Sequence, residues 1–489
     1  MSETAGIAML AAVAVLLIAT GLPAWQVLLG VALAFAAGGM AAGVFALPLL
    51  TAMPARLLGL LEQDILQALP LYVLMGALLN HLPLAEILFR TGNRVLARSG
   101  AGPSLTGLGL GVLLAPMNGA VGASVAMLSR TVQPRLEASG VPLPKSAALV
   151  CVASTLGVVI PPSLVLILLG DAMMRAHTEA TILTHESVRI INTQDVFVGA
   201  LVPAALLLAL CALVAWRTNR GAADPAGVRR PTFREGLTAG MTVAFIGSLF
   251  TAVTLGYLYA VEAAAFGAVA LFAFGLATGT LTRTVLSAVL RDTMAVTGAL
   301  FALLLAATMF TLVVRAFGTD RWLAAALVRL NMGETGSLLV VLAIIGACAL
   351  VLDAFEMIFV VIPLAIPPLL TLVHDATWVA VLTLLILQAS FLTPPFGYAV
   401  LMVRNSVRSG LPLSRLARAL LPYLVMQFLV LALVLAWPAL IWQRNPSSLA
   451  ANGAAPDAAG AMSDDEARRM LERALPAPPG DDPGRDGKE

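Results

Sequence analysis

The stretch TLGVVIPPSLVLILLG, residues 155–170, is apolar enough to cross a membrane, yet two adjacent prolines stand in its middle. Proline supplies no backbone N–H and its ring clashes with the preceding helical turn, so Pro161 and Pro162 predict a break. The chain repeats this arrangement in SFLTPPFGYAVL, with Pro394 and Pro395. Broken helices at membrane depth are tolerated only where they are buried in protein or line a wet cavity. The two breaks therefore indicate a functional site inside a membrane protein.

The composition places the breaks in a polytopic, all-α membrane protein. The 489 residues are 60% hydrophobic and 11% charged, and many apolar runs reach the length of about 18 residues that crosses a bilayer. The net charge of +2 resides in loops, so we expect no nucleic-acid partner. No GxxxxGK[ST] motif is present, which excludes ATP hydrolysis by this chain. Residues 443–489 are rich in Ala, Pro, Gly, Asp and Arg, and are predicted to be a disordered tail.

Two long regions, 104–174 and 336–404, share one order of features. In each, an apolar arm leads to a polar or small-residue tip, a second arm returns, and a Pro-Pro-broken helix follows. The tip-to-break spacing is 43 residues from Asn118 to Pro161 and 41 from Asp353 to Pro394. We interpret this as an internal duplication. The predicted elements are a hairpin at 104–134 with a broken helix at 145–174, and a hairpin at 336–371 with a broken helix at 376–404. An amphipathic segment precedes each hairpin, at 82–98 and 318–331. A single span follows each broken helix, at 196–216 and 419–442.

Basic residues decide whether the two repeats are direct or inverted, because they stay on the cytoplasmic side. Residues 217–235 and 404–418 are rich in arginine, whereas 171–195 contains four acids and two arginines and fits outside. The two hairpins then enter from opposite sides, so the repeats are inverted. The predicted organisation is a first repeat at 1–216, a cytoplasmic linker at 217–235, a second repeat at 236–442 and the tail at 443–489, with about ten crossings, two hairpins and both ends outside.

Inverted repeats with broken helices and hairpins are typical of secondary transporters of the elevator type. The start of a half-helix attracts an anion, and freed carbonyls coordinate Na⁺. Asp353 stands at the second tip, where an acid is costly and functional by default, although it can also cap the following arm. Asn118 at the first tip is a ligand or a turn former. Glu262 at the start of its span is interpreted as an acid of the first helical turn.

Four segments together resemble the large membrane subunit of TRAP (tripartite ATP-independent periplasmic) transporters, over residues 1–442. They are GAVGASVAML, TLGVVIPPSLVLILLG, LVLDAFEMIFVVIPLAIPPL and LQASFLTPPFGYAVL. The resemblance implies a multi-pass permease of the cell inner membrane with no cofactor, which uses Na⁺ as the coupling ion. It also implies a small four-helix membrane subunit, a periplasmic substrate-binding protein and an organic-acid substrate; the branch that the chain most resembles includes carriers of keto acids.

The resemblance also implies the site residues. The expected Na⁺ ligands are Asn118, Gly119, Ser124, Ser154 and Thr155 in the first site, and Asp353 and Thr393 in the second. The organic acid is expected at the first tip and the two breaks, against Asn118, Gly119, Pro162, Ser163 and Pro395. Many members carry a serine-rich first tip, whereas this chain has PMNGAVGAS, so the amide oxygen of Asn118 takes that place.

Two other functions compete with this one. A stand-alone di- or tricarboxylate carrier shares the architecture, but such carriers tend to have Ser-Asn-Thr tips, which are absent here. An intramembrane enzyme needs a catalytic set at depth, whereas the four histidines, His81, His177, His185 and His374, stand near span ends or in loops. His177 and His185 lie in the segment 175–195. We interpret this segment as a solvated external loop rather than a metal site. We therefore expect a transporter and no enzyme activity.

Overall fold

The computed structural model describes residues 2–44, 51, 53–62, 64–118, 120–161, 163–184, 191–221, 232–330, 332–406 and 410–441. These ranges are helical and contain no strand, as the sequence predicts. The predicted tail at 443–489 lies outside the described residues.

The first half of the chain contains the spans, hairpin and broken helix expected there, and one short helix, α4, that the sequence did not predict. Its elements are α1 (Ser2–Thr20), α2 (Ala24–Ala41), α4 (Met53–Leu61), α5 (Asp64–His81), α6 (Leu84–Leu96), η1 (Ala97–Ser99), α7 (Gly102–Leu114), η2 (Ala115–Asn118), α8 (Val121–Thr131), α9 (Gln133–Ala138), α10 (Leu143–Val159), α11 (Leu164–Thr184) and α12 (Thr193–Thr218).

The second half repeats the hairpin and the broken helix. Its elements are α13 (Phe233–Leu255), α14 (Ala260–Ala277), α15 (Arg283–Ala316), α16 (Thr319–Leu330), α17 (Gly333–Cys348), α18 (Ala354–Glu356), the π-helical η3 (Met357–Val361), α19 (Ile362–Leu370), α20 (Ala376–Leu392), α21 (Tyr398–Ser406), α22 (Leu413–Ala436) and η4 (Pro438–Leu440). The N-terminal role of Glu262 is confirmed, because its Oε2 accepts a 2.9 Å hydrogen bond from the Tyr259 N–H at the start of α14.

Within the described residues, six helices are long and apolar enough to cross a membrane: α2, α12, α13, α14, α15 and α22. Two bent helix pairs pass the same test together and raise the number to as many as eight. In one pair α6 turns away from α5 by 65°, and in the other α10 and α11 meet at 41°. The figure of about ten crossings stays a prediction.

The hairpin arms are too short to cross. At 1.5 Å per residue, the 13 residues of α7 span about 20 Å and the 16 residues of α17 about 24 Å, against a hydrocarbon core of about 30 Å. Both arms end in a short irregular tip before the chain returns. This length deficit is what the sequence predicts for re-entrant hairpins.

Two hydrogen bonds show how each broken helix is oriented relative to the span that follows it. Lys145 Nζ at the start of α10 donates to the carbonyl of Thr218 at the end of α12, at 2.8 Å. Trp378 Nε1 at the start of α20 donates to the carbonyl of Val434 near the end of α22, at 3.0 Å. Each broken helix therefore runs antiparallel to its following span in both halves.

One further contact fixes the relative direction of the two halves. A methyl group added at Gly199, near the start of α12, would lie 2.9 Å from Cγ2 of Thr377 at the start of α20. Because the start of α10 lies at the opposite end of α12, α10 and α20 run in opposite directions. This is the geometry of inverted repeats, although the division of the chain at 217–235 stays a prediction.

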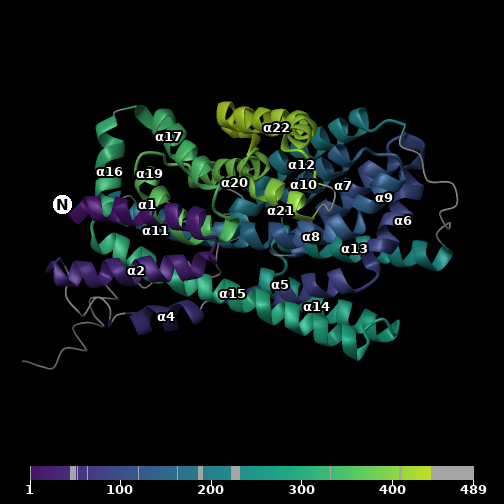
Figure 1. Cartoon of the computed structure of the whole chain (residues 1–489), viewed down its shortest axis with the longest axis horizontal. Helices are drawn as coiled ribbons and strands as arrows, with labels where there is room; N and C mark the ends of the chain where they lie inside the picture. Colours follow the sequence, from purple (N-terminus) through teal and green to yellow (C-terminus); the bar gives the residue numbers. More distant parts are fainter. Residues whose placement is uncertain are drawn as a thin grey trace, which may run out of the picture. The chain divides into compact units, whose positions relative to one another are not determined.

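The broken helices form the interior of the bundle. Every residue from Ser146 to Val159 is buried, and α10 packs against α7, α8, α20 and α22. Figure 1 shows α5, α14 and α15 along one side and α22 along the other, with α10, α20 and α21 between them. Helices at the edge expose apolar side chains, such as Phe233 and Met241 of α13, as expected for contact with lipid or another subunit.

The predicted external loop at 175–195 is wrong over most of its length. Helix α11 continues to Thr184, and α12 begins at Thr193. His177 is buried and its Nδ1 accepts a 3.4 Å hydrogen bond from the Ile191 N–H, so it is not solvated. Acidic and basic residues in this stretch suggested a loop, but Glu179 pairs with Arg315 on α15, and Arg175 pairs with Asp171 within α11. His185 lies outside the described residues.

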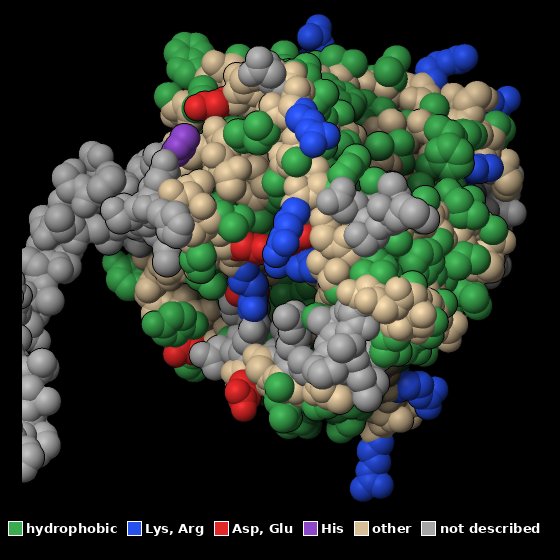
Figure 2. Space-filling view, turned by 90° about the vertical axis from the view of Figure 1, so that its left-hand side faces the viewer, with side chains coloured by type: hydrophobic (Ala, Val, Ile, Leu, Met, Phe, Trp, Pro, Cys, Tyr) green, Lys and Arg blue, Asp and Glu red, His purple; other side chains and the backbone are tan. Residues whose placement is uncertain are grey.

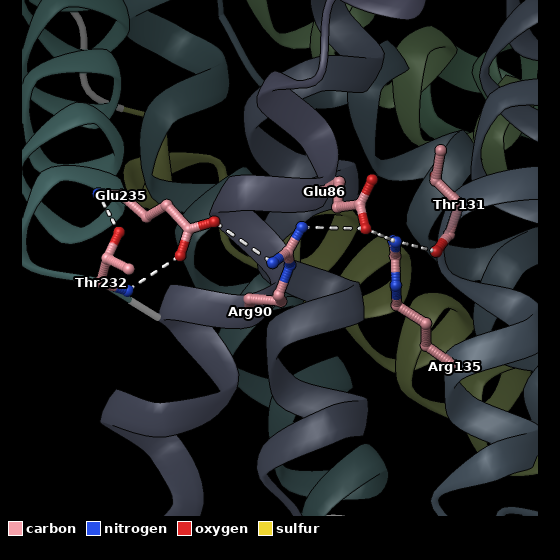
Figure 3. Close-up of polar contacts among 6 residues, drawn as sticks. All are labelled: Glu86, Arg90, Thr131, Arg135, Thr232 and Glu235. Atoms are coloured by element: carbon pink, nitrogen blue, oxygen red, sulfur yellow. Dashed lines mark hydrogen bonds and ion pairs between the residues drawn. The ribbon is translucent and has the colours of Figure 1, made fainter. Parts of the chain in front are cut away.

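The base of the first hairpin is connected to two neighbouring helices by ion pairs (Figure 3). Arg90 on α6 contacts Glu86 at 3.1 Å and Glu235 on α13 at 3.2 Å. Arg135 on α9 contacts Glu86 at 2.9 Å and donates to the Thr131 carbonyl at 2.7 Å. The network joins the amphipathic helix α6 to the hairpin and to the first span of the second half.

Cysteine labelling in intact cells tests the predicted topology. In a background without Cys151, Cys211 and Cys348, an impermeant maleimide should modify Leu183→Cys at the end of α11 and spare Ser414→Cys at the start of α22. Both side chains are exposed, so access to the reagent decides the outcome. The reverse pattern would overturn the assignment of basic segments to the cytoplasm.

Candidate functional site

The first tip lies directly on the first broken helix. A methyl group added at Gly111 would lie 2.5 Å from both Cβ and the carbonyl oxygen of Ala153, and one added at Gly157 would lie 2.5 Å from Cβ of Ala115. These two glycines let α7 and η2 approach the backbone of α10. Glycine is required at both positions because any side chain would push the tip away from the break.

A small cavity lies where the first tip meets the first break. Its volume of about 10 Å³ suits one water-sized particle. Ser124, Ser154 and Ser163 line it, together with Pro116 and Gly157. Three of the residues predicted from the sequence are thus brought together from α8, α10 and the start of α11.

The hydroxyl groups near this cavity donate to backbone carbonyls. Ser154 Oγ donates to Cys151 at 2.8 Å, and Ser163 Oγ donates to Val158 at 2.9 Å while accepting the Leu166 N–H at 3.0 Å. A hydroxyl that donates its proton still has lone pairs to offer, and oxygen atoms are what a hard cation requires. Thr155 also donates, to Cys151 and Val152, but it does not line the cavity.

The second tip holds two acids. Asp353 is half-buried, its backbone N–H donates to Glu356 Oε2 at 3.1 Å, and its own Oδ1 is buried without a hydrogen-bond partner among the described residues. Asp353 therefore stands at the N-cap position of α18, with Glu356 reaching back to its N–H, and one of its own carboxylate oxygens remains available. The five π-helical residues of η3 follow at once, and π-helical turns are frequent at functional sites.

The second break is a tight turn rather than an open gap. The Thr393 hydroxyl donates to Ala389 at 2.8 Å, and the Thr393 carbonyl accepts the Gly397 N–H at 2.9 Å. Pro395 is exposed. A methyl group at Gly397 would lie 2.6 Å from the Phe391 carbonyl oxygen, so the turn needs glycine. The sequence led us to expect freed carbonyls at this break, but the turn itself satisfies that of Thr393.

The functional parts of the two halves meet through Tyr398 at the start of α21. A methyl group added at Gly122, just after the first tip, would lie 3.0 Å from the Tyr398 hydroxyl oxygen. A methyl group added at Gly346, near the end of the first arm of the second hairpin, would lie 3.6 Å from the Ser390 hydroxyl oxygen on α20, just before the second break. The first tip, the second tip and the second break therefore form one region. The sequence analysis missed Tyr398, although its place directly after the break could have indicated it.

A larger cavity of about 310 Å³ opens beside the second hairpin, between α11, α15, η3 and α19. Its polar lining includes Asp171, Arg175, Glu179, Thr311 and Arg315. Figure 2 shows the end of the molecule that carries α11, where basic and acidic side chains gather around a hollow. The volume is that of a pocket for a small organic molecule.

Arg315 joins three helices at the edge of this cavity. It forms two hydrogen bonds of 2.9 Å with the Glu179 carboxylate on α11, and one of 2.8 Å with the Pro363 carbonyl on α19. A bidentate pair of this kind fixes geometry as well as adding energy. Sequence reasoning missed it because the partners are 136 residues apart.

Gln388 of α20 was missed as well. It is fully buried, and neither of its amide atoms has a hydrogen-bond partner among the described residues. A lone amide in the apolar run LTLLILQASFL, one turn before the break, was a signal in the sequence. Gly119 and Pro162 lie outside the described residues, as does the side chain of Asn118, so their predicted roles stay predictions.

Helices broken beside paired hairpins, with oxygen atoms gathered at both tips, define a membrane transporter. The family of tripartite ATP-independent periplasmic transporters, DctM component, matches residues 10–440, and the chain belongs to it. The protein is thus a multi-pass transporter permease of the inner membrane rather than an enzyme.

Two relatives carry the name of this family, and one solved structure shares the fold. The chain is 26% identical over 388 residues to the C4-dicarboxylate TRAP transporter large permease protein DctM of Pseudomonas aeruginosa, covering 77% of this chain and 85% of that protein. It is 23% identical over 392 residues to the sialic acid TRAP transporter large permease protein SiaM of Vibrio cholerae, covering 78% and 86%. The Alcanivorax borkumensis YdaH transporter shares the fold, with a TM-score of 0.56 and 18% identity over 81% of this chain and 90% of that one.

A double-mutant cycle tests the contribution of Arg315. Glu179→Gln should lower the apparent unfolding temperature by roughly 1–2 °C, because a partly exposed ion pair contributes at most about 1 kcal/mol. Arg315→Gln should lower it more, because it also removes the bond to the Pro363 carbonyl, and the double variant should match Arg315→Gln. Arg130→Gln is the control, since Arg130 is exposed and its hydrogen bond to the Ala126 carbonyl lies within α8 and joins no two helices. Additive losses would show that the pair does not hold α11 against α15.

Proposed function

We propose that this protein is the large membrane subunit of a Na⁺-coupled secondary transporter that imports an organic acid. In this proposal a periplasmic binding protein delivers the acid, and a small four-helix membrane subunit accompanies the large one. The observation that carries the proposal is the meeting of both tips and both broken helices in one region, through Tyr398 and the serine-lined cavity.

The proposed Na⁺ ligands follow from chemistry already described. Ser124, Ser154 and Ser163 surround a space for one small particle, and a hard cation prefers such oxygen atoms. Asp353 supplies a carboxylate oxygen at the other tip. Na⁺ bound at these places neutralises charge at the tips and makes the approach of an anionic substrate favourable.

The proposed substrate is a small carboxylate. The cavity beside the second hairpin can hold a molecule of that size, and relatives are named for C4-dicarboxylates and for sialic acid, both organic acids. The start of α11, capped by Ser163, adds a favourable partial charge for a carboxylate.

Uptake by proteoliposomes tests the proposal. Vesicles that contain both membrane subunits are supplied with purified binding protein and a panel of labelled dicarboxylates, keto acids and sialic acid, under an inward Na⁺ gradient. We expect uptake of one class of acid, and only with the binding protein present. Uptake at the same rate without the binding protein would instead support a stand-alone di- or tricarboxylate carrier.

A further inference from the structure

A second groove, remote from the tips, lies where α10, α12 and α22 come together. It has a volume of about 300 Å³, and its lining comes from the start of α10, the end of α12 and the start of α22. The lining residues are Pro142, Pro144, Lys145, Thr218, Arg415, Arg418, Ala419, Pro422 and Tyr423. The proposed transport function uses none of them.

The charges in this groove are all positive. Lys145, Arg415 and Arg418 line it, and among the described residues no Asp or Glu does. Lys145 Nζ donates to the Thr218 carbonyl at 2.8 Å, which holds the ammonium at the groove. Neither arginine forms an ion pair within the described part of the chain. Three cations without a carboxylate indicate a place for an anion of more than one charge or a phosphate diester.

Glu137 of α9 lies close to the start of α10 but adds no negative charge to the lining of the groove. Glu137 of α9 accepts from Ser146 Oγ at 3.3 Å and from Gln133 Nε2 at 3.0 Å, and it does not line the groove. The charged side chains that line the groove are therefore all basic, and they would attract an anion that enters it.

The rest of the groove is apolar, which distinguishes a lipid from a soluble anion. Prolines and Ala419 form its walls, and Tyr423 is buried at its base. Below the arginines, α22 exposes a stripe of apolar side chains at helical spacing, namely Leu421, Val425, Phe428 and Leu429. A phosphate held by the cations would have its acyl chains along this stripe.

The distribution of basic residues places this end of the three helices at the cytoplasmic surface. Basic pockets between membrane helices on that side recognise anionic lipid headgroups. We propose that this groove, formed by α10, α12 and α22, binds the phosphate headgroup of an anionic phospholipid through Lys145, Arg415 and Arg418.

Thermal unfolding of the purified full chain in neutral-detergent micelles tests the site, with phosphatidylglycerol as the probe. A ligand that binds only the folded state raises the unfolding temperature in a saturable way. Phosphatidylglycerol should raise it by several degrees, whereas phosphatidylcholine and inorganic phosphate should have little effect. An equal response to phosphatidylcholine, or to inorganic phosphate alone, would overturn the assignment to an anionic lipid.

Paired variants separate a built site from general surface charge. Arg415→Gln with Arg418→Gln should weaken the apparent affinity for phosphatidylglycerol at least tenfold, and lysine at both positions should restore most of it. Arg283→Gln with Arg291→Gln removes two exposed charges from α15 and should leave the affinity unchanged. An equal loss in both pairs would contradict the proposal.

Discussion

Replacing Gly111 by alanine is expected to lower the apparent unfolding temperature by several degrees and to reduce transport severely. The added methyl group would lie 2.5 Å from the Ala153 carbonyl oxygen, so α7 must move away from α10. Overpacking of this kind costs about 1–3 kcal/mol of the free energy of unfolding. The displacement would also move the first tip away from the break, which is why we expect activity to fall more than stability. Thermal unfolding and initial uptake rates measure the two effects.

Gly109→Ala is the matched control, on the same helix and two residues away. A methyl group there meets no atom within 4 Å, and alanine is a better helix former than glycine by about 1 kcal/mol. This variant should be at least as stable as the wild type and should transport normally. If both alanines had the same effect, close packing of the tip on α10 would not explain the glycine at 111.

Asp353→Asn is expected to raise the half-saturating Na⁺ concentration for transport at least several-fold. The substitution keeps the size of the side chain and its ability to cap a helix, but a neutral oxygen replaces a carboxylate. Each tenfold loss of affinity corresponds to about 1.4 kcal/mol, and the loss of one charged ligand is of that order. Uptake measured against Na⁺ concentration in wild type and variant gives the shift.

The alternative role of Asp353 predicts a different result. Asn caps a helix about as well as Asp, so a purely capping residue would leave transport nearly normal. Asp375→Asn is the control, because Asp375 caps α20 by accepting the Trp378 N–H at 2.9 Å and belongs to neither tip. An unchanged Na⁺ requirement with a normal maximal rate in Asp353→Asn would remove this residue from the proposed site.

The sequence predicted the parts of this fold that follow from local rules. Proline chemistry predicted the breaks at Pro161 and Pro394, and the repeated order of features predicted the two hairpins. The distribution of basic residues predicted that α10 and α20 run in opposite directions. The loop predicted at 175–195 was wrong because Glu179 pairs with Arg315, 136 residues away, and because His177 is buried and accepts the Ile191 N–H; the order of charges along the sequence reveals neither contact.

The site was predictable to a smaller extent, for the same reason. The resemblance to TRAP transporters implied Ser124, Ser154 and Ser163 as site residues, and the structure brings them around one cavity. Tyr398 and Arg315 depend on contacts between the two halves, and spacing along the sequence contains no information about those contacts. Residues that join repeats are thus the part of a transporter that the sequence of a single chain reveals least.

The central claim is that Na⁺ and an organic acid cross the membrane together. Initial fluxes of ²²Na⁺ and labelled substrate, measured in the same proteoliposomes with binding protein and both membrane subunits, test it most directly. The account predicts that substrate accelerates Na⁺ entry, and that replacing Na⁺ by choline at fixed pH abolishes substrate uptake. Equal substrate uptake in choline, with no substrate-dependent ²²Na⁺ flux, would contradict it.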